Sequence, residues 1–352
     1  MKPVTFVLVG AGGIAQSYAS AFENHPSAKL TAVVDVRADA ADALAARFGG
    51  RAFASTESLF ASGSSVDAAI LCTPPNTHES ITQKLVKRGL HVLCEKPFTF
   101  TAESARAMAT AADRAGVLLT MGSKFRYVDD VTRAKQLIAS GVIGEVVLFE
   151  NAFTGRVDMT RRWNSDPAIG GGGVLIDNGT HSVDLMRYFL GPLAEIHAVE
   201  GKNLQGLLVE DTARLFVKSR SGIMGSVDLS WSIDKELDWY VTVYGSLGTI
   251  QIGWRQSRYK LGSCKEWVVF GQGYDKVKAF RDQVANFTGA IRGTEPLRIT
   301  CEDAVASVEV MEAAYSSLRA SAWTGIESTR MNLSNTPLSL LTLDALRDSW
   351  NG

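Results

Sequence analysis

The stretch Val4-Thr-Phe-Val-Leu-Val-Gly-Ala-Gly-Gly-Ile-Ala15 decides the fold of this chain. Its first six residues are apolar or β-branched, which predicts a buried strand. Gly10, Gly12 and Ala15 follow at the spacing of a dinucleotide-binding turn. Gly10 permits the tight turn, Gly12 lets backbone N–H groups approach a pyrophosphate, and the small Ala15 lets a helix pack on the strand. The pyrophosphate would then lie at the positive N-terminal end of that helix.

An acidic residue ends the next predicted strand. Leu30-Thr-Ala-Val-Val-Asp35 is again apolar, and Asp35 follows the glycines by about 20 residues, where a carboxylate binds the adenosine ribose. Such a carboxylate accepts hydrogen bonds from the ribose hydroxyls and repels a 2′-phosphate, so NAD is favoured over NADP. Arg37 leaves this choice open, since it would pair with a 2′-phosphate, stack on adenine or lie in solvent. The alternative for Asp35 itself is a solvated strand end.

Length and composition limit the class of protein. At 352 residues the chain exceeds one ordinary domain, and 46% hydrophobic with 21% charged residues is typical of a globular protein. A net charge of −1 gives no reason to expect nucleic acid or an anionic membrane as partner. The four cysteines show no C-x-x-C spacing, so we expect neither a metal site nor a disulfide framework.

Localisation is expected to be cytoplasmic. Lys2, the following apolar stretch and Ala19-Ser-Ala21 loosely resemble a secretory signal, but that stretch contains three glycines and forms the nucleotide-binding strand. No run of about 20 apolar residues is present in the sequence, so no membrane span is predicted.

The pattern of elements changes once along the chain. Short apolar runs alternate with Ala-rich helical segments over the first 120 residues or so, which predicts a doubly wound parallel sheet. After Ser140-Gly141, period-2 runs separated by Gly-rich joints predict a largely antiparallel sheet. We therefore expect an α/β Rossmann domain over residues 1–123, an α+β domain for substrate binding and oligomerisation over 124–325, and a C-terminal arm over 326–352.

Three segments supply candidate chemistry. Cys72-Thr-Pro-Pro-Asn-Thr-His78 and Cys94-Glu-Lys-Pro97 follow the fourth and fifth predicted strands, and in a doubly wound sheet these strand ends line the cofactor crevice. The third is Gly170-Gly-Gly-Gly-Val-Leu-Ile-Asp-Asn-Gly-Thr-His-Ser-Val-Asp184. If it is helical from Val174, Asp177 and His181 lie on one face, one turn apart.

Together these segments resemble the glucose–fructose oxidoreductase / inositol dehydrogenase / MocA family, from Val4 to about residue 320. Glu-Lys-Pro alone is a common tripeptide. At the end of the fifth strand, followed about 80 residues later by Asp-x-x-x-His, it is quite specific. The resemblance implies hydride transfer between a nicotinamide and a secondary alcohol or ketone, usually of a sugar or cyclitol.

By the same resemblance, Lys96, Asp177 and His181 occupy the positions of the family's catalytic Lys, Asp and His. An imidazole titrating near neutrality can remove the hydroxyl proton as hydride leaves, so His181 is the candidate general base. Lys96 would stabilise alkoxide charge and lower the pKa of a nearby imidazolium, and Asp177 would orient a substrate hydroxyl. The structural alternatives are a surface ion pair at Glu95-Lys96, an interior histidine, and a helix N-terminal carboxylate.

Further site residues are predicted from their place in these segments. The cofactor is expected to contact Gly10, Gly12, Gly13, Ile14, Asp35, Arg37, Thr73, Pro74, Asn76, His78, Glu95 and Lys96. The substrate is expected to contact Lys96, Arg126, Arg162, Trp163, Asp177 and His181. Asn76 has the alternative of capping the next helix, the arginines that of surface ion pairing, and Trp163 that of a core or pocket wall.

The sequence thus favours an NAD(H)-dependent oxidoreductase acting on a carbohydrate-like small molecule. Two alternatives are an NAD-dependent glycosidase that oxidises its substrate transiently, and a sugar- or nucleotide-sensing protein without chemistry. We also expect a homodimer or homotetramer built through an apolar outer face of the second domain's sheet, with Trp231, Trp239 and Trp254 at the subunit interface.

Overall fold

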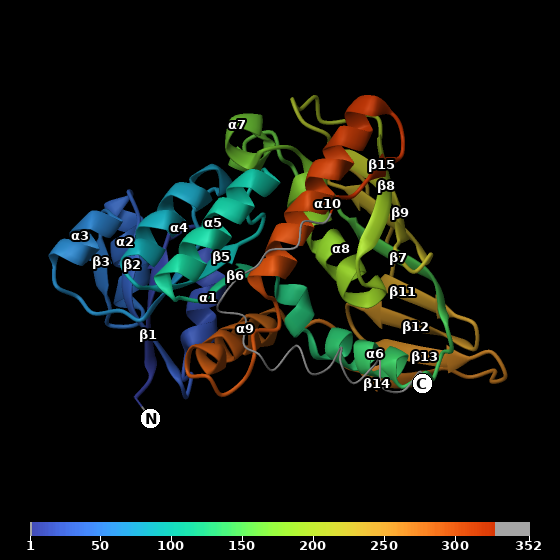
Figure 1. Cartoon of the computed structure of the whole chain (residues 1–352), viewed down its shortest axis with the longest axis horizontal. Coiled ribbons are helices and arrows are strands. Elements are labelled where there is room, and N and C mark those ends of the chain that lie inside the picture. Colours follow the sequence, from blue (N-terminus) through green and yellow to red (C-terminus); the bar gives the residue numbers. More distant parts are fainter. Residues whose placement is uncertain (1, 328–352) are drawn as a thin grey trace.

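The computed structural model describes residues 2–327, in two lobes (Figure 1). The predicted C-terminal arm lies outside the described residues, apart from its first two.

A six-stranded parallel sheet with helices on both faces forms the first lobe, as predicted (Figure 1). Its order is β3-β2-β1-β4-β5-β6, so the topological switch point lies between β1 and β4, directly beside the glycine turn. The central strand β1 is buried because parallel sheets are covered on both faces, and Phe6, Val7 and Leu8 are inaccessible to solvent. The strands are β1 (Val4–Val9), β2 (Ala28–Val34), β3 (Arg51–Phe53), β4 (Ala68–Leu71), β5 (His91–Glu95) and β6 (Leu119–Gly122). The helices are α1 (Gly13–Phe22), α2 (Ala38–Ala46), α3 (Thr56–Ala61), α4 (His78–Lys87) and α5 (Ala102–Ala115), with a 3₁₀ turn η1 (Pro75–Thr77).

A nine-stranded sheet forms the second lobe, and its order is β14-β13-β12-β11-β7-β10-β9-β8-β15. It is antiparallel except for the β7–β10 pair, which confirms the predicted mixed architecture. The strands are β7 (Val146–Thr154), β8 (Leu193–Glu200), β9 (Thr212–Ser219), β10 (Met224–Ser230), β11 (Trp239–Gly245), β12 (Gly248–Gly253), β13 (Ser257–Leu261), β14 (Val268–Gly271) and β15 (Thr324–Gly325). The period-2 runs of the sequence had not indicated β12 or β13, which depend on pairing with their neighbours.

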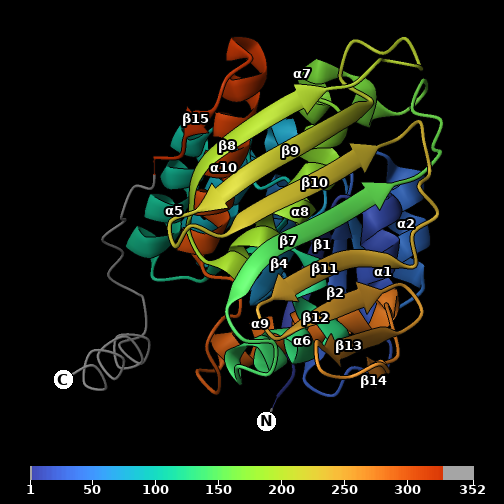
Figure 2. The same cartoon turned by 90° about the vertical axis from the view of Figure 1, so that its right-hand side faces the viewer.

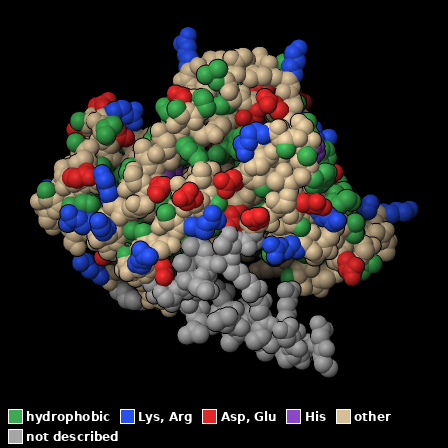
Figure 3. Space-filling view, turned by 45° about the horizontal axis from the view of Figure 1, so that its top comes forward, with side chains coloured by type: hydrophobic (Ala, Val, Ile, Leu, Met, Phe, Trp, Pro, Cys, Tyr) green, Lys and Arg blue, Asp and Glu red, His purple; other side chains and the backbone are tan. Residues whose placement is uncertain are grey.

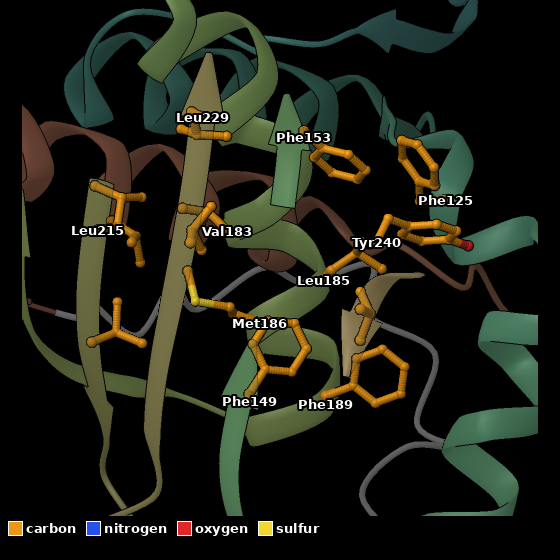
Figure 4. Close-up of a cluster of buried hydrophobic side chains, with 14 of the residues drawn as sticks. Phe125, Phe149, Phe153, Val183, Leu185, Met186, Phe189, Leu215, Leu229 and Tyr240 are labelled. Carbon is orange, nitrogen blue, oxygen red and sulfur yellow. The ribbon is translucent and has the colours of Figure 1, made fainter. Parts of the chain in front are cut away.

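Helices cover only one face of this sheet (Figure 2). The helices that contact the sheet are α6 (Asp129–Ala139), α8 (Val174–Leu190) and α10 (Cys301–Ala320). The remaining elements are α7 (Pro167–Gly170) and α9 (Lys276–Ile291), of which α9 packs against α1, and the 3₁₀ turns η2 (Lys124–Tyr127) and η3 (Trp163–Ser165). Helix α8 is buried around most of its circumference, because the sheet lies on one side and α10 on another. Figure 4 shows Val183 and Met186 of α8 beside Leu215, Leu229 and Phe149 of the sheet. This packing fixes the helix that carries Asp177 and His181.

The last two helices connect the lobes. Phe280, Val284 and Phe287 of α9 belong to the hydrophobic core beneath α1, and Val305 and Val308 of α10 belong to the core on the other face of the parallel sheet. A chain segment assigned to the second domain therefore completes the core of the first. The predicted boundary near residue 123 stays a prediction for the chain's division into domains.

The outer face of the second sheet differs from the expected apolar surface. Phe216 and Met224 are exposed there, but Arg214 and Asp228 form an ion pair on the same face. Trp231 is 3% exposed and lies in the protein core, so the expected interface role is wrong for this residue. Trp254 packs against Tyr240 and Tyr274. No helix in residues 2–327 has the length and apolar character needed to cross a membrane.

Candidate active site

The glycine turn after β1 leaves space for a ligand. Gly10 has φ +98°, and a Cβ there would lie 2.8 Å from the backbone of Cys72. Around Gly12 and Gly13, by contrast, a Cβ would meet none of the described atoms within 4 Å. Helix α1 begins at Gly13 with no side-chain cap, so its first N–H groups are available to an anion. The turn therefore fits the pyrophosphate of a dinucleotide.

Asp35 lies directly beside this turn. Its Oδ2 accepts a hydrogen bond from the Ala11 N–H at 2.7 Å, and its Oδ1 accepts one from the Arg37 N–H at 2.8 Å. Burial raises the pKa of Asp35, but these hydrogen bonds outweigh it and lower the pKa overall, so the carboxylate is ionised at neutral pH. Arg37 pairs with Asp35 through Nε at 3.3 Å and is otherwise 61% exposed. The carboxylate is thus rigidly placed and still has lone pairs for ribose hydroxyls.

Lys96 reaches across the cleft between the lobes. It follows β5, and its ammonium donates hydrogen bonds to Asp177 Oδ1 at 2.5 Å and to the Asp177 carbonyl oxygen at 3.0 Å. Both side chains are mostly shielded, with 16% and 22% of their areas exposed. The pair joins the cofactor lobe to the first turn of α8; the sequence assigned both residues to one site but did not predict this ion pair.

The glycine run before α8 is required by close packing. A Cβ on Gly172 would lie 1.9 Å from the Tyr315 hydroxyl, and one on Gly173 would lie 2.0 Å from the Glu210 carbonyl oxygen. The Glu210 carboxylate accepts hydrogen bonds from the N–H groups of Gly173 and Leu175 and from the Tyr315 hydroxyl. Sequence patterns did not indicate Glu210, because it caps α8 from a loop 35 residues away. It holds the start of the helix that presents Asp177.

His181 lies one turn after Asp177, as predicted, and is 7% exposed. Its ring meets Phe125 edge-on, with centroids 5.0 Å apart, and its Nδ1 has no hydrogen-bond partner among the described residues. Burial, and then the positive charges of Lys96 and Lys124, lower the pKa of His181 well below 6.5. The imidazole is therefore neutral at pH 7 and able to accept a proton. The pKa of His181 is therefore lower than the near-neutral pKa expected from the sequence.

One cleft is lined by part of the predicted cofactor set and by two of the three predicted catalytic residues, Lys96 and Asp177; His181 is not part of its lining. Those of its lining residues that the sequence predicted are Ile14, Thr73, Glu95, Lys96, Trp163 and Asp177. The sequence did not predict Cys72, Pro75, Pro97, Asn164, Gly170 and Ile176, which complete the lining. Most of these residues are apolar or line the cleft with backbone atoms, so their residue types gave no indication of a functional role.

Several predicted contacts lie elsewhere. Arg126 is buried between the lobes in ion pairs with Asp184 and Asp303, so the structure does not support it as a substrate ligand. The ring nitrogens of His78, which is inaccessible to solvent, lie 2.9–3.2 Å from the carbonyl oxygens of Thr73, Pro97 and Phe98.

His78 therefore shapes the two strand-end loops from inside, and its side chain cannot reach a cofactor. Asn76 donates a hydrogen bond to the Ala168 carbonyl oxygen of α7, which connects its loop to the second lobe. Arg162 is exposed, and neither it nor Pro74 lines the cleft.

Lys124 is the residue that sequence reasoning missed. It opens η2 after β6, beside the strand that ends in Glu95, and it influences both Lys96 and His181 electrostatically. Burial, and then the positive charge of Lys96, lower the pKa of Lys124 to about 8. Only the pairing of β5 with β6 brings the two lysines together, and no local motif records it. No group of three or more His, Cys, Asp or Glu side chains in residues 2–327 is placed to hold a metal ion.

Comparison with known proteins agrees with this geometry. Residues 4–123 match the model of an oxidoreductase family with an NAD-binding Rossmann fold, and residues 131–251 match the GFO/IDH/MocA C-terminal domain. The chain is 29% identical to the rhizopine catabolism protein MocA of Rhizobium meliloti over 87% of this chain and 92% of that protein. It is 28% identical to scyllo-inositol 2-dehydrogenase (NAD(+)) of Bacillus subtilis over 84% and 87%.

The solved structure of GenD2 from gentamicin A biosynthesis, in complex with NAD, superposes with a TM-score of 0.82 at 28% identity, covering 93% of this chain and 97% of that one. With the glycine turn, Asp35 and the Lys96–Asp177–His181 cluster, these matches define an NAD-dependent oxidoreductase that acts on CH–OH groups. The chain belongs to the GFO/IDH/MocA family.

Proposed function

We propose that this protein transfers a hydride between NAD and the carbon of a secondary hydroxyl or keto group in a sugar, sugar derivative or cyclitol, using Lys96, Asp177 and His181. The observation that carries the proposal is the Lys96–Asp177 pair across the interlobe cleft, with His181 one turn further along α8. The same cleft reaches Ile14 and Thr73 at the glycine turn and the end of β4. The relatives named above, among them an inositol dehydrogenase, support the substrate class.

The chain's own groups account for the proton and the charge. A dinucleotide held at the glycine turn and Asp35 would supply the hydride acceptor for oxidation of the carbinol carbon, or the hydride donor for reduction of the ketone. His181 takes the hydroxyl proton during oxidation and donates it during reduction, and its lowered pKa keeps it in the accepting form at pH 7. Lys96 stabilises the negative charge that builds on the substrate oxygen, and Asp177 accepts a hydrogen bond from a substrate hydroxyl. Phe125 and Phe153 close one side of His181 against water.

A substrate screen tests this function. Purified protein is incubated with NAD and a panel of sugars, sugar phosphates, nucleotide sugars and inositols, and NADH is followed by absorbance. We expect stoichiometric NADH formation with at least one panel member. Bond cleavage without NADH accumulation would instead identify a glycosidase with transient oxidation. Tight sugar binding without either product would identify a sensor.

We also propose that the protein forms a homodimer or homotetramer through the outer face of the second sheet, and that it works in the cytoplasm. The uncovered sheet face supports the assembly, because Val199, Phe216 and Met224 are exposed on it (Figure 2). Figure 3 shows another side of the molecule, where acidic and basic side chains are mixed and no broad area of one sign stands out. All four cysteines are free thiols, two of them buried, which supports a reducing compartment.

A further inference from the structure

Lys124 is a partly buried cation to which no residue within 2–327 serves as an ion-pair partner. Its ammonium lies 5.4 Å from the ring centroid of Phe125 and 5.8 Å from that of Phe280. Across the described chain it forms no ion pair and no hydrogen bond. Lysines are rarely withdrawn from water without a partner, since desolvation of an unpaired charge is costly. The position of this ammonium therefore indicates that its counter-ion is an anionic group of a bound ligand.

The nearby carboxylates are already engaged. Asp177 is paired with Lys96 at 2.5 Å. Glu95 accepts hydrogen bonds from the Tyr18 hydroxyl at 2.7 Å and from the Lys96 N–H at 3.1 Å, one on each oxygen. The remaining charged neighbour of Lys124 is Lys276, which has the same sign. The reaction centre therefore presents one lysine matched to a carboxylate and a second one that is unmatched.

Lys124 lies close to the catalytic cluster. Phe125, whose ring it approaches, also packs edge-on against His181 with centroids 5.0 Å apart. Lys124 acts electrostatically on His181 and Lys96, and Asp177 acts on it. Lys124 and His181 thus approach the same phenylalanine ring, which places the ammonium beside the catalytic cluster.

We propose that Lys124 binds an anionic group of the substrate, a carboxylate or a phosphate, and so selects acidic or phosphorylated sugars over neutral ones. This inference rests on the proposed function for the identity of the site. A direct ammonium–oxyanion hydrogen bond should favour the anionic substrate roughly ten- to one hundredfold, the strength typical of a charge-assisted bond.

Binding to the NAD-loaded protein tests the proposal even while the natural substrate is unidentified. D-glucose, D-glucuronate and D-glucose 6-phosphate are titrated by calorimetry into the wild type and into Lys124→Met, whose side chain still packs on the two rings. Lys276→Met is the matched control, because it removes an exposed positive charge from the same neighbourhood. Lys124→Gln also removes the charge and is the second variant if Lys124→Met does not fold, whereas Lys124→Arg keeps the charge. NADH formation is recorded with each sugar in parallel.

We expect at least one anionic sugar to bind ten- to one hundredfold more tightly than glucose. This preference should vanish in Lys124→Met and persist in Lys276→Met and Lys124→Arg. Preference for glucuronate identifies a carboxylate, and preference for glucose 6-phosphate a phosphate.

Equal affinities for all three sugars would overturn the proposal, as would an equal loss in both Met variants, which would indicate only long-range attraction. Lys124-dependent anion binding without hydride transfer would uphold the anion site and refute the proposed function. If glucose is turned over equally by wild type and Lys124→Met and no anionic sugar is preferred, the proposed function is upheld and the anion site is refuted.

Discussion

Replacing Lys96 with methionine isolates the contribution of its charge. The side chain is 16% exposed, and its ammonium makes both of its hydrogen bonds to Asp177, so methionine fills the same space without the cation. Loss of a preorganised group at a developing oxyanion typically lowers kcat by about 10²- to 10³-fold, or roughly 2.7–4 kcal/mol. NAD affinity should change little, because we expect the glycine turn and Asp35 to bind the far end of the cofactor.

Stability must be separated from catalysis in this variant. Lys96→Met leaves the mostly shielded Asp177 carboxylate without its cation, which should cost about 1–3 kcal/mol of unfolding free energy. Lys96→Met combined with Asp177→Asn removes both charges, so the melting temperature should recover while kcat remains low. Lys84→Met is the matched control, because it breaks an exposed ion pair with Glu57 on the protein surface.

The assay is steady-state NADH formation on the substrate found in the screen, with NAD affinity from fluorescence quenching and melting by circular dichroism. A kcat within threefold of wild type for Lys96→Met would refute the reasoning. Recovery of kcat together with stability in the double variant would show that Lys96 acts only through the fold.

Three other residues give further predictions. Asp35→Ser should narrow the preference for NAD over NADP in kcat/KM, because it removes the carboxylate that repels a 2′-phosphate; equal use of both cofactors by the wild type would show that Arg37 dominates. His181→Asn should lower kcat roughly 100- to 10,000-fold and abolish an acid limb of the oxidation rate that lies below pH 6.5, since the pKa of His181 is lowered by burial and two lysines. The folded protein resists protonating His181, so wild-type stability is complete above the unfolded pKa of 6.5 and falls below it. In urea melts, the free energy of unfolding of the wild type relative to His181→Asn should fall by up to about 1.4 kcal/mol per pH unit below pH 6.5. If the difference in unfolding free energy between the two proteins stayed constant from about pH 7.5 to 5.5, the burial argument would be contradicted. Phe216→Glu should reduce the mass measured by light scattering to that of one chain, 37.9 kDa, whereas a monomeric wild type would refute the proposed assembly.

Sequence patterns worked best where the signal was local. The strand–turn–helix around Gly10 and the one-turn spacing of Asp177 and His181 follow from short-range periodicity and backbone freedom. Strands β12 and β13 were not predicted, because their stability comes from partners in the sheet. Arg126 has the charge that a substrate ligand would need, but its guanidinium forms a buried ion pair with Asp184.

The sequence by itself determined the dinucleotide turn, the acidic end of β2 and the order of the Lys, Asp and His motifs. Each depends on residues within one strand, turn or helix, where steric limits and side-chain period act directly on neighbours in the chain. Only the tertiary structure decided that Lys96 meets Asp177 across 81 residues, that Glu210 caps α8, and that Lys124 lies beside the pair. Those contacts depend on strand order and helix packing. Both result from the sum of many weak packing interactions across the whole core, and no single local motif in the sequence encodes that sum.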